Sequence, residues 1–352
     1  MRTDKLYRLR KAMGKALMLS SFVVASALLS SFFSSCVHQF PEQEDLEYNV
    51  VLEVNHILEW LPEYEMTLSR AEMGEYDIRY DFKVYPKGNT SDCVKSFTIY
   101  KADLSRPDFT TTLYLYPGEY DIYAWSDYAY AADGSPVYYD DDNFANITYI
   151  KPYEGDTDFR DAFRGMTSLT VEDPGMYEPQ PVHGVITLSR PLARYKFIAT
   201  DLAEFIDHET TRGKLAPPGD PMDASQRWAK LSDYRVKVIY PLYMPAVFNI
   251  FRNNPVDSWT GVDFSCSMTQ LSDTEAMLAM DYVMVNGLQS SVQVMLEVYA
   301  PDGLLLARTN TMTIPTKRDR TTLVYNKFLT TIRNDGVGIN PDFEGEFNIE
   351  IK

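Results

Sequence analysis

Apolar and polar residues alternate with a period of two in many short windows of this chain. A β-strand places successive side chains on opposite faces, so this alternation predicts strands with one face in a core and one in water. The clearest windows are residues 76–84, 96–100, 111–115, 120–125, 184–188 and 235–240. Only three short windows fit helices instead, at residues 202–207, 223–231 and 319–329. The pattern therefore predicts an all-β fold.

Turn residues separate the predicted strands. Pro301-Asp302-Gly303 stands between strand patterns at 291–299 and 304–308, which is a strong hairpin signal. Pro117-Gly118 separates two further windows, where the glycine would supply the positive φ of a tight turn. Many short strands with such turns are typical of β-sandwiches.

A cluster of prolines divides the chain into two parts of ordinary domain size. Between residues 171 and 183 the sequence contains three prolines, which cannot continue a strand or a helix. About 130 to 170 residues lie on each side of this region, and domains of 100 to 200 residues are common. We therefore expect two tandem β-sandwich domains, at residues 46–183 and 184–352.

The first 35 residues have the pattern of a secretory signal. Six basic residues and one acidic residue precede or flank an apolar run at residues 16–29, and no further acid occurs before Glu42. The run of about 14 residues is shorter than the roughly 20 that a membrane-spanning helix needs. Small residues directly before Cys36 resemble the lipobox of bacterial lipoproteins, which implies that the Cys36 thiol is acylated. Residues 1–35 are then a lipoprotein signal peptide, and several acyl chains would anchor the protein stably.

Residues 36–45 form a short, polar and acidic segment without periodicity, which predicts a flexible tether. Acidic residues after the lipidated cysteine resemble the surface-export signal of Bacteroidetes lipoproteins; the alternative is a solvated linker without a routing role. We expect a lipid-anchored, surface-exposed protein of the cell outer membrane.

The charge balance and the missing motifs exclude several classes of function. The chain has 33 basic and 50 acidic residues, a net charge of −17, and such a surface repels nucleic acids. It contains no nucleophile elbow, phosphate-binding loop or zinc-protease helix, and its four histidines are isolated. We therefore expect no enzymatic activity, no catalytic residues and no cofactor.

Two acidic clusters invite comparison with calcium sites. They are Asp140-Asp141-Asp142-Asn143 and the spaced set Asp156, Asp158 and Asp161. Neither has the order of an EF-hand, so we expect solvated loops and no metal. Cys93 and Cys266 lie far apart in the sequence and in different predicted domains, which favours two free or buried thiols over a disulfide.

Aromatic residues crowd one stretch of the first predicted domain. Tyr123 and Trp125 alternate in a strand window and are expected in the core. Four tyrosines lie in a more polar stretch and could instead contact host or microbial glycans: Tyr128, Tyr130, Tyr138 and Tyr139. This suggests a surface glycan-binding lipoprotein as an alternative function.

Three longer segments carry a family resemblance, namely residues 115–127, 188–197 and 314–330. Together with the lipobox and the acidic tether, they resemble the fimbrillin-like lipoproteins of Bacteroidetes, a family that includes fimbrial shaft, tip and anchor subunits. The resemblance covers nearly the whole chain. It implies two tandem transthyretin-like, Greek-key β-sandwich domains, and other fimbrial subunits as partners. The function it implies is that of a structural, anchor or adhesive subunit.

The resemblance also implies a route of assembly. Family shaft subunits polymerise by strand donation, in which a protease removes the first strand and a neighbour's extended segment fills the groove. The candidate donor strand contains Phe347, Ile349 and Ile351, alternating with polar residues; the alternative is the last strand of the chain's own sheet. Arg70, the first Lys or Arg after Cys36, is the candidate cleavage point, or else a solvated charge. Retention of the lipid would suit an anchor, and the sequence does not decide between shaft, tip and anchor.

Overall fold

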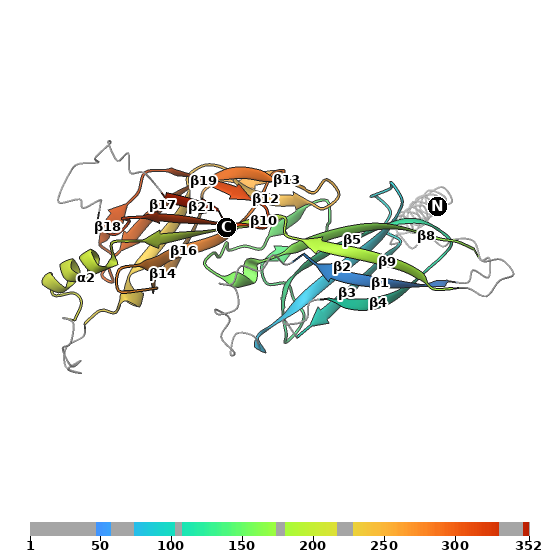
Figure 1. Cartoon of the computed structure of the whole chain (residues 1–352), viewed down its shortest axis with the longest axis horizontal. Helices are drawn as coiled ribbons and strands as arrows, with labels where there is room; N and C mark the ends of the chain where they lie inside the picture. Colours follow the sequence, from blue (N-terminus) through green and yellow to red (C-terminus); the bar gives the residue numbers. More distant parts are fainter. Residues whose placement is uncertain are drawn as a thin grey trace, which may run out of the picture. The chain divides into compact units, whose positions relative to one another are not determined.

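The computed structural model describes residues 47–57, 74–102, 108–173, 180–216 and 228–330, and the backbone of residues 348–351. Residues Glu47–Lys352 form one compact unit. Its described part is built almost wholly from strands (Figure 1), with one α-helix, α2 (Leu202–Thr211), and two short 3-10 helices, η4 (Asp158–Arg160) and η5 (Leu231–Asp233). The prediction of an all-β fold is confirmed.

We call the described residues up to Ser189 the N-terminal half and those from Leu192 the C-terminal half. Seven strands from the N-terminal half form one sheet in the order β3-β2-β5-β8-β9-β1-β4. All neighbouring pairs are antiparallel except β1 and β9, which run parallel. The alternating windows of the sequence supply most of these strands. Their bounds are β1 (Tyr48–His56), β2 (Tyr76–Pro86), β3 (Lys95–Lys101), β4 (Phe109–Leu115), β5 (Gly118–Tyr130), β8 (Phe163–Val171) and β9 (Val182–Ser189).

The long central strand β5 faces two separate hydrophobic cores. Ile122 and Ala124 lie in a first core with the inward residues of β1, β2, β4 and β9. All buried members of this core fall between residues 48 and 188. Tyr123 and Trp125 point the opposite way, into a second core that extends to Leu329. All four side chains are buried, so the expectation that Tyr123 and Trp125 are core residues is confirmed.

Two five-stranded sheets come from the C-terminal half. One has the order β15-β16-β10-β20-β21, and the other has the order β14-β11-β17-β18 with β19 also paired to β17. Their bounds are β10 (Leu192–Ala199), β11 (Arg235–Tyr240), β14 (Val262–Ser267), β15 (Thr269–Gln270), β16 (Ala276–Met284), β17 (Gln289–Tyr299), β18 (Leu305–Arg308), β19 (Met312–Lys317), β20 (Thr321–Asn326) and β21 (Asn348–Ile351).

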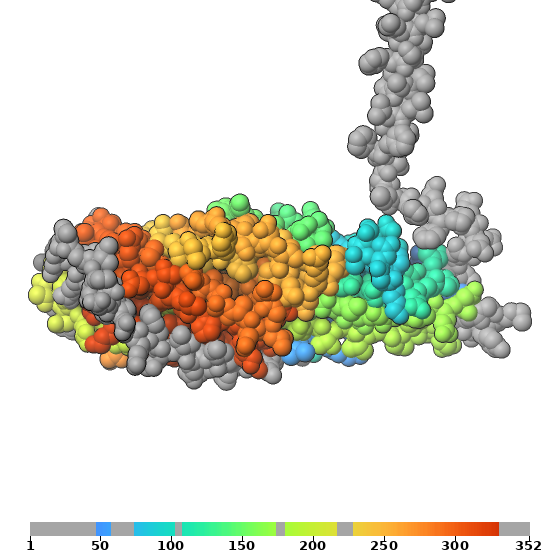
Figure 2. Space-filling view, turned by 90° about the horizontal axis from the view of Figure 1, so that it is seen from above, coloured from blue at the N-terminus to red at the C-terminus, as the bar shows by residue number. Residues whose placement is uncertain are grey.

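A fourth sheet joins residues from both halves of the chain. Its order is β13-β12-β7-β6, with β6 (Tyr139–Asp140) and β7 (Ile147–Tyr149) from the N-terminal half and β12 (Met244–Asn249) and β13 (Asn254–Trp259) from the C-terminal half. Figure 2 shows the green residues around β6 and β7 lying against the gold residues of β12 and β13. The two halves therefore share backbone hydrogen bonds as well as the second core.

The expected boundary between residues 183 and 184 falls inside β9. This strand pairs with β1 along residues 182–188, so it belongs to the seven-stranded sheet. Pro181 directly precedes β9, and the neighbouring prolines Pro174 and Pro179 lie outside the described residues. The division into two tandem sandwiches stays a prediction, because residues 47–352 are one compact unit with two cores.

Two local expectations hold and two do not. The Pro-Asp-Gly turn joins β17 and β18, with Gly303 at φ 84°, and α2 begins in the first predicted helical window. Residues 321–326, however, form the strand β20 rather than a helix. The expected positive φ at Gly118 is wrong as well: Gly118 is not among the glycines with a positive φ and is the first residue of β5.

Candidate functional site

The first strand of the described chain, β1, lies inside the seven-stranded sheet between β9 and β4 (Figure 1). It pairs antiparallel with β4 over residues 48–54 and parallel with β9 over residues 50–56. Among the described residues, β4 has no other ladder partner, and β9 otherwise meets β8 only at Leu188 and Ser189. Removal of β1 would therefore leave the backbone groups of two strands unpaired along one slot.

Alternate side chains of β1 also fill the first core. Val50, Leu52 and Val54 are fully buried, whereas Glu53 between them is exposed. Gly184 of β9 stands opposite Leu52, and a Cβ there would approach the Leu52 side chain to 3.3 Å. The slot thus combines a hydrogen-bonding edge on each side with an apolar floor, which is what an added strand requires.

The end of β1 is fixed by His56. Its backbone N–H donates to Asp108 Oδ1 at 2.8 Å, and its ring packs edge-on against Tyr80 and Phe163. Burial lowers the pKa of His56 below its usual value, although the nearby Asp108 carboxylate acts in the opposite direction. The next residue, Ile57, donates its N–H to the Leu188 carbonyl at 2.8 Å. β1 is therefore held as far as its last residue.

The predicted processing residues are only partly covered by the structure. Cys36, Arg70 and Phe347 lie outside the described residues. The backbone of residues 348–351, which includes Ile349 and Ile351, forms β21 and pairs antiparallel with β20 at the edge of its sheet. This is the pairing expected of the last strand of the chain's own sheet, and donation to another subunit stays a prediction.

The four tyrosines expected to contact glycans do not form one exposed platform. Tyr139 is fully buried and its hydroxyl donates to the Arg160 carbonyl at 2.6 Å, so its prediction as a glycan contact is wrong. Tyr128 and Tyr138 are half-buried, and Tyr138 packs against the second core. Only Tyr130 is exposed. Tyr128 and Tyr130 are two residues apart on β5 and so share a face of that strand, whereas Tyr139 of β6 is directed into the second core.

The first acidic cluster is not a solvated loop, because Asp141 is buried in an ion-pair network. Its Oδ1 lies 2.9 Å from Arg79 Nη2, and the same guanidinium lies 2.9 Å from Asp127 and 3.2 Å from Asp81. Burial, followed by the nearby Asp127 and Asp81 carboxylates, raises the pKa of Asp141 to about 9. One guanidinium cannot neutralise three carboxylates, so the fold favours a proton on Asp141.

This network predicts that the protein loses stability as the pH rises. The folded-state pKa of Asp141 lies above its unfolded value, so the native state binds more protons and its stability falls between the two pKa values. We expect the free energy of unfolding to drop by about 1 to 3 kcal/mol between pH 6.5 and 8.5. Urea titrations at both pH values measure this drop, and Asp141→Asn should remove most of it. The matched change at the exposed Asp142, Asp142→Asn, should leave it intact. An equal drop in all three proteins would contradict the assignment.

The second acidic cluster is also engaged in ion pairs. Arg190 Nε lies 2.8 Å from the buried Asp161, and Arg194 Nη1 lies 3.1 Å from Asp158. Asp156 accepts a hydrogen bond from the Met280 N–H at 3.0 Å. The expectation of a solvated loop is therefore wrong here too. In the part of the chain that the structure describes, no group of three or more His, Cys, Asp or Glu side chains could hold a metal ion.

A fully buried arginine, Arg160, connects the two halves. Its guanidinium carbon lies 4.0 Å from the ring centroid of Tyr153 and 4.4 Å from that of Tyr149, and its Nε lies 3.5 Å from Asp281 Oδ1. Asp281 in turn accepts a hydrogen bond from the Tyr153 hydroxyl at 2.6 Å. Burial raises the pKa of Asp281, and the Arg160 charge opposes that shift. These contacts fix the segment around η4 to β16.

Both described cysteines are free thiols, as expected. Cys93 is exposed, whereas Cys266 is partly buried and its thiol donates to the Leu278 carbonyl at 3.2 Å. Burial raises the pKa of Cys266 above its usual value. Cys93 is therefore the more reactive of the two. In the same described ranges, none of the helices has the length and apolar character needed to cross a membrane.

Comparison with known proteins gives one family and several similar structures. The model of a family of unknown function, DUF6562, matches residues 42–352. None of the curated proteins matches the chain. Among solved structures, a DUF1812 protein from Bacteroides thetaiotaomicron VPI-5482 is 12% identical, with a TM-score of 0.43 over 81% of this chain and 94% of that one.

Two of the other similar structures are fimbrial proteins. A fimbrial assembly protein from Parabacteroides distasonis ATCC 8503 is 12% identical, with a TM-score of 0.41 over 88% of this chain and 96% of that chain. The tip fimbrial protein Mfa3 from Porphyromonas gingivalis is 11% identical, with a TM-score of 0.41 over 86% and 98% respectively. Proteins described as fimbrial are thus among the solved structures to which this chain is similar.

Proposed function

This chain belongs to DUF6562, a family of unknown function, and we propose that it is a fimbrial structural, anchor or adhesive subunit at the cell surface. In this proposal the acylated Cys36 holds the protein in the outer membrane, and residues 36–45 separate the lipid from the folded part. The lipobox and the acidic tether of the sequence support the anchor. The β-sheet that contains β1 supports the assembly function.

The single observation that carries the assembly function is the position of β1. It is the first strand of the described chain, yet it occupies an interior place and is the main ladder partner of both its neighbours. A strand in this position can be replaced by another extended segment without rearranging the rest of the sheet. Strand exchange at this slot is therefore the mode of contact between subunits that we propose.

The end of the chain is the proposed donor to a neighbouring subunit. Among the described residues, β21 pairs on one side only, with four residues of β20. Such a short edge pairing involves few hydrogen bonds, and no other described strand pairs with β21. The alternation of Phe347, Ile349 and Ile351 with polar residues suits a slot whose floor is apolar.

Mapping the N-terminus of protein taken from the cell surface separates the roles. An anchor is expected to begin at a lipid-modified Cys36, whereas a subunit activated by cleavage is expected to begin at Ala71, directly after Arg70. Mass spectrometry of the N-terminal peptide distinguishes the two. A mature protein with an unmodified Cys36 and an uncut Arg70 would contradict both versions of the proposal.

Peptide uptake tests strand exchange directly. Full-length protein is cut after Arg70 and mixed with a fluorescent peptide of residues 343–352, and bound peptide is followed by size-exclusion chromatography. We expect uptake by the cut protein and none by an Arg70→Ala variant that carries β1 intact. A peptide with Ile349→Asp serves as the matched control, because a charge in the apolar slot opposes insertion. Equal uptake of both peptides, or uptake of neither, would contradict the proposed exchange.

A further inference from the structure

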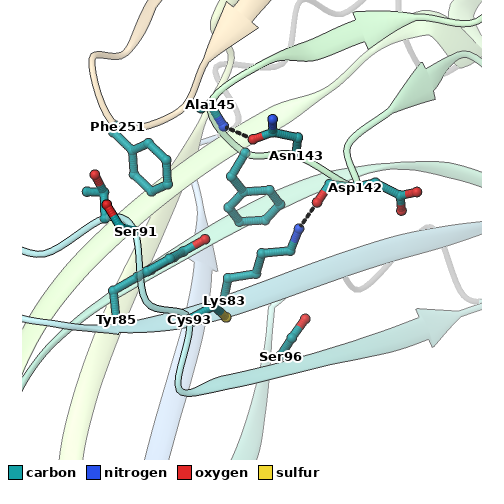
Figure 3. Close-up of a pocket in the computed structure, with 11 residues that line it drawn as sticks. Lys83, Tyr85, Ser91, Cys93, Ser96, Asp142, Asn143, Ala145 and Phe251 are labelled. Atoms are coloured by element: carbon teal, nitrogen blue, oxygen red, sulfur yellow. Dashed lines mark hydrogen bonds between the residues drawn. The ribbon is translucent and has the colours of Figure 1, made fainter. Parts of the chain in front are cut away.

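A hollow of about 490 Å³ lies between three loops that are distant in the sequence. Its walls come from the end of β2, the β2–β3 loop and the start of β3, from the β6–β7 loop, and from the turn between β12 and β13. Figure 3 shows Phe251, Ser91 and Tyr85 on one side of it, and Asn143, Asp142 and Lys83 on the other. Small-molecule sites commonly occupy 300 to 1,000 Å³, so the hollow has room for a ligand of a few rings.

One wall of the hollow is aromatic and rigid. The Phe251 ring packs edge-on against Tyr85, with centroids 5.3 Å apart, and against Tyr123, with centroids 4.9 Å apart. Tyr85 and Tyr123 are buried, so they hold the partly exposed Phe251 in place. A supported flat ring at the mouth of a hollow offers an apolar platform to one face of a ligand.

The cation beside the hollow is already engaged by the protein. Lys83 Nζ donates to the Asp141 carbonyl at 3.2 Å and to the Asp142 carbonyl at 2.5 Å, and it lies 4.3 Å from the ring centroid of Phe144. The exposed carboxylate of Asp142 has no hydrogen-bond or ion-pair partner among the described residues. Lys83 and Asp142 therefore bring one positive and one negative charge to the hollow, and these two groups together favour neither an anionic nor a cationic ligand.

Uncharged polar groups remain available around the aromatic wall. Asn143 uses its Oδ1 to accept the Ala145 N–H at 3.0 Å, which leaves its amide NH₂ to donate elsewhere. The hydroxyls of Ser91 and Ser96 line the hollow and have no hydrogen-bond partners within the described ranges. Groups that can both donate and accept suit a ligand that carries several hydroxyls.

We propose that this hollow binds a neutral saccharide. A pyranose ring has an apolar C–H face for Phe251 and hydroxyls on its rim for Asn143 and the serines, and it is uncharged, as suits a hollow where Lys83 and Asp142 carry opposite charges. The inference goes beyond assembly by strand exchange, because the hollow uses neither β1 nor β21. It also places the saccharide at different residues from Tyr128, Tyr130, Tyr138 and Tyr139.

Retention on an array of neutral, sialylated and sulfated glycans tests this proposal with the full-length protein. We expect retention of neutral members, reduced about tenfold or more by Phe251→Ala and by Asn143→Ala. Phe251→Leu keeps the apolar contact but removes the flat ring. It should also reduce retention, and it replaces the alanine variant in the test if that variant fails to fold. Tyr243→Ala alters a side chain that is 72% exposed and lies outside the hollow, and it should retain glycans normally.

The exposed thiol in the hollow supplies an independent readout. Cys93 lines the hollow, so a bound neutral glycan should slow its reaction with a thiol reagent such as DTNB, and the Cys93→Ala variant identifies that part of the signal. The proposal is overturned if no neutral glycan is retained, or if only acidic glycans are retained. Retention that is unaffected by the Phe251 and Asn143 variants, or binding that leaves the Cys93 rate unchanged, would overturn it as well.

Discussion

Replacing Arg160 with alanine is expected to lower the free energy of unfolding by about 3 to 5 kcal/mol, because it removes one partner of a buried ion pair. The side chain is only 1% exposed and lies against the rings of Tyr149 and Tyr153. Without it, Asp281 keeps a charge in the interior with only hydroxyl and backbone donors around it. The loss of packing against two rings adds to that cost.

Urea unfolding followed by near-ultraviolet circular dichroism measures this effect, since tyrosines surround the site. Arg252→Ala provides the matched control, because Arg252 is exposed in the turn between β12 and β13. We expect the control to change stability by no more than about 0.5 kcal/mol. A loss below about 1 kcal/mol in Arg160→Ala would show that the contacts of Arg160 do not hold the two halves together.

Truncation of Leu52 to alanine is expected to cost about 2 to 5 kcal/mol. Leu52 is fully buried in the middle of β1, and β4 and β9 on both sides restrict how far the sheet can close around the lost volume. The same change at the neighbouring Glu53, which points to solvent, should be nearly neutral. Thermal unfolding of the two variants makes the comparison.

The Leu52 variant also reports on strand exchange. If β1 is the replaceable strand, Leu52→Ala should take up the 343–352 peptide faster than the wild-type protein after cleavage at Arg70, because the resident strand binds its slot more weakly. Glu53→Ala should behave like the wild-type protein. If the Leu52→Ala protein is less stable but takes up the peptide no faster, β1 is not the strand that the peptide replaces.

Local patterns predicted the strands well and their partners poorly. Period-two windows gave β2, β3, β4, β5, β9 and β11, and the Pro-Asp-Gly turn gave the hairpin of β17 and β18. The mistaken helix at residues 319–329 is the strand β20, which pairs in parallel with β10. The partner of a parallel strand is distant in the sequence, so the residues around a strand do not predict which strand it pairs with.

The candidate sites were harder to predict for the same reason. Acidic runs look alike whether they face water or a distant arginine, and Arg79 and Arg190 lie far in the sequence from Asp141 and Asp161, the members of the two runs that they contact. The hollow near Phe251 draws its residues from three loops, none of which carries a motif. The place of β1 within the sheet likewise depends on long-range pairing, with β4 and β9.

The parallel pairing of β1 with β9 has a consequence for the growing chain. Ribosomes make β1 first, yet Val50 has to wait for Val182 to be synthesised before this ladder can form. Until then its apolar side chains need cover from a chaperone or from a temporary neighbour, and such distant contacts form slowly. β1, the first of the described strands to be synthesised, is thus among the last to complete its pairing in the sheet.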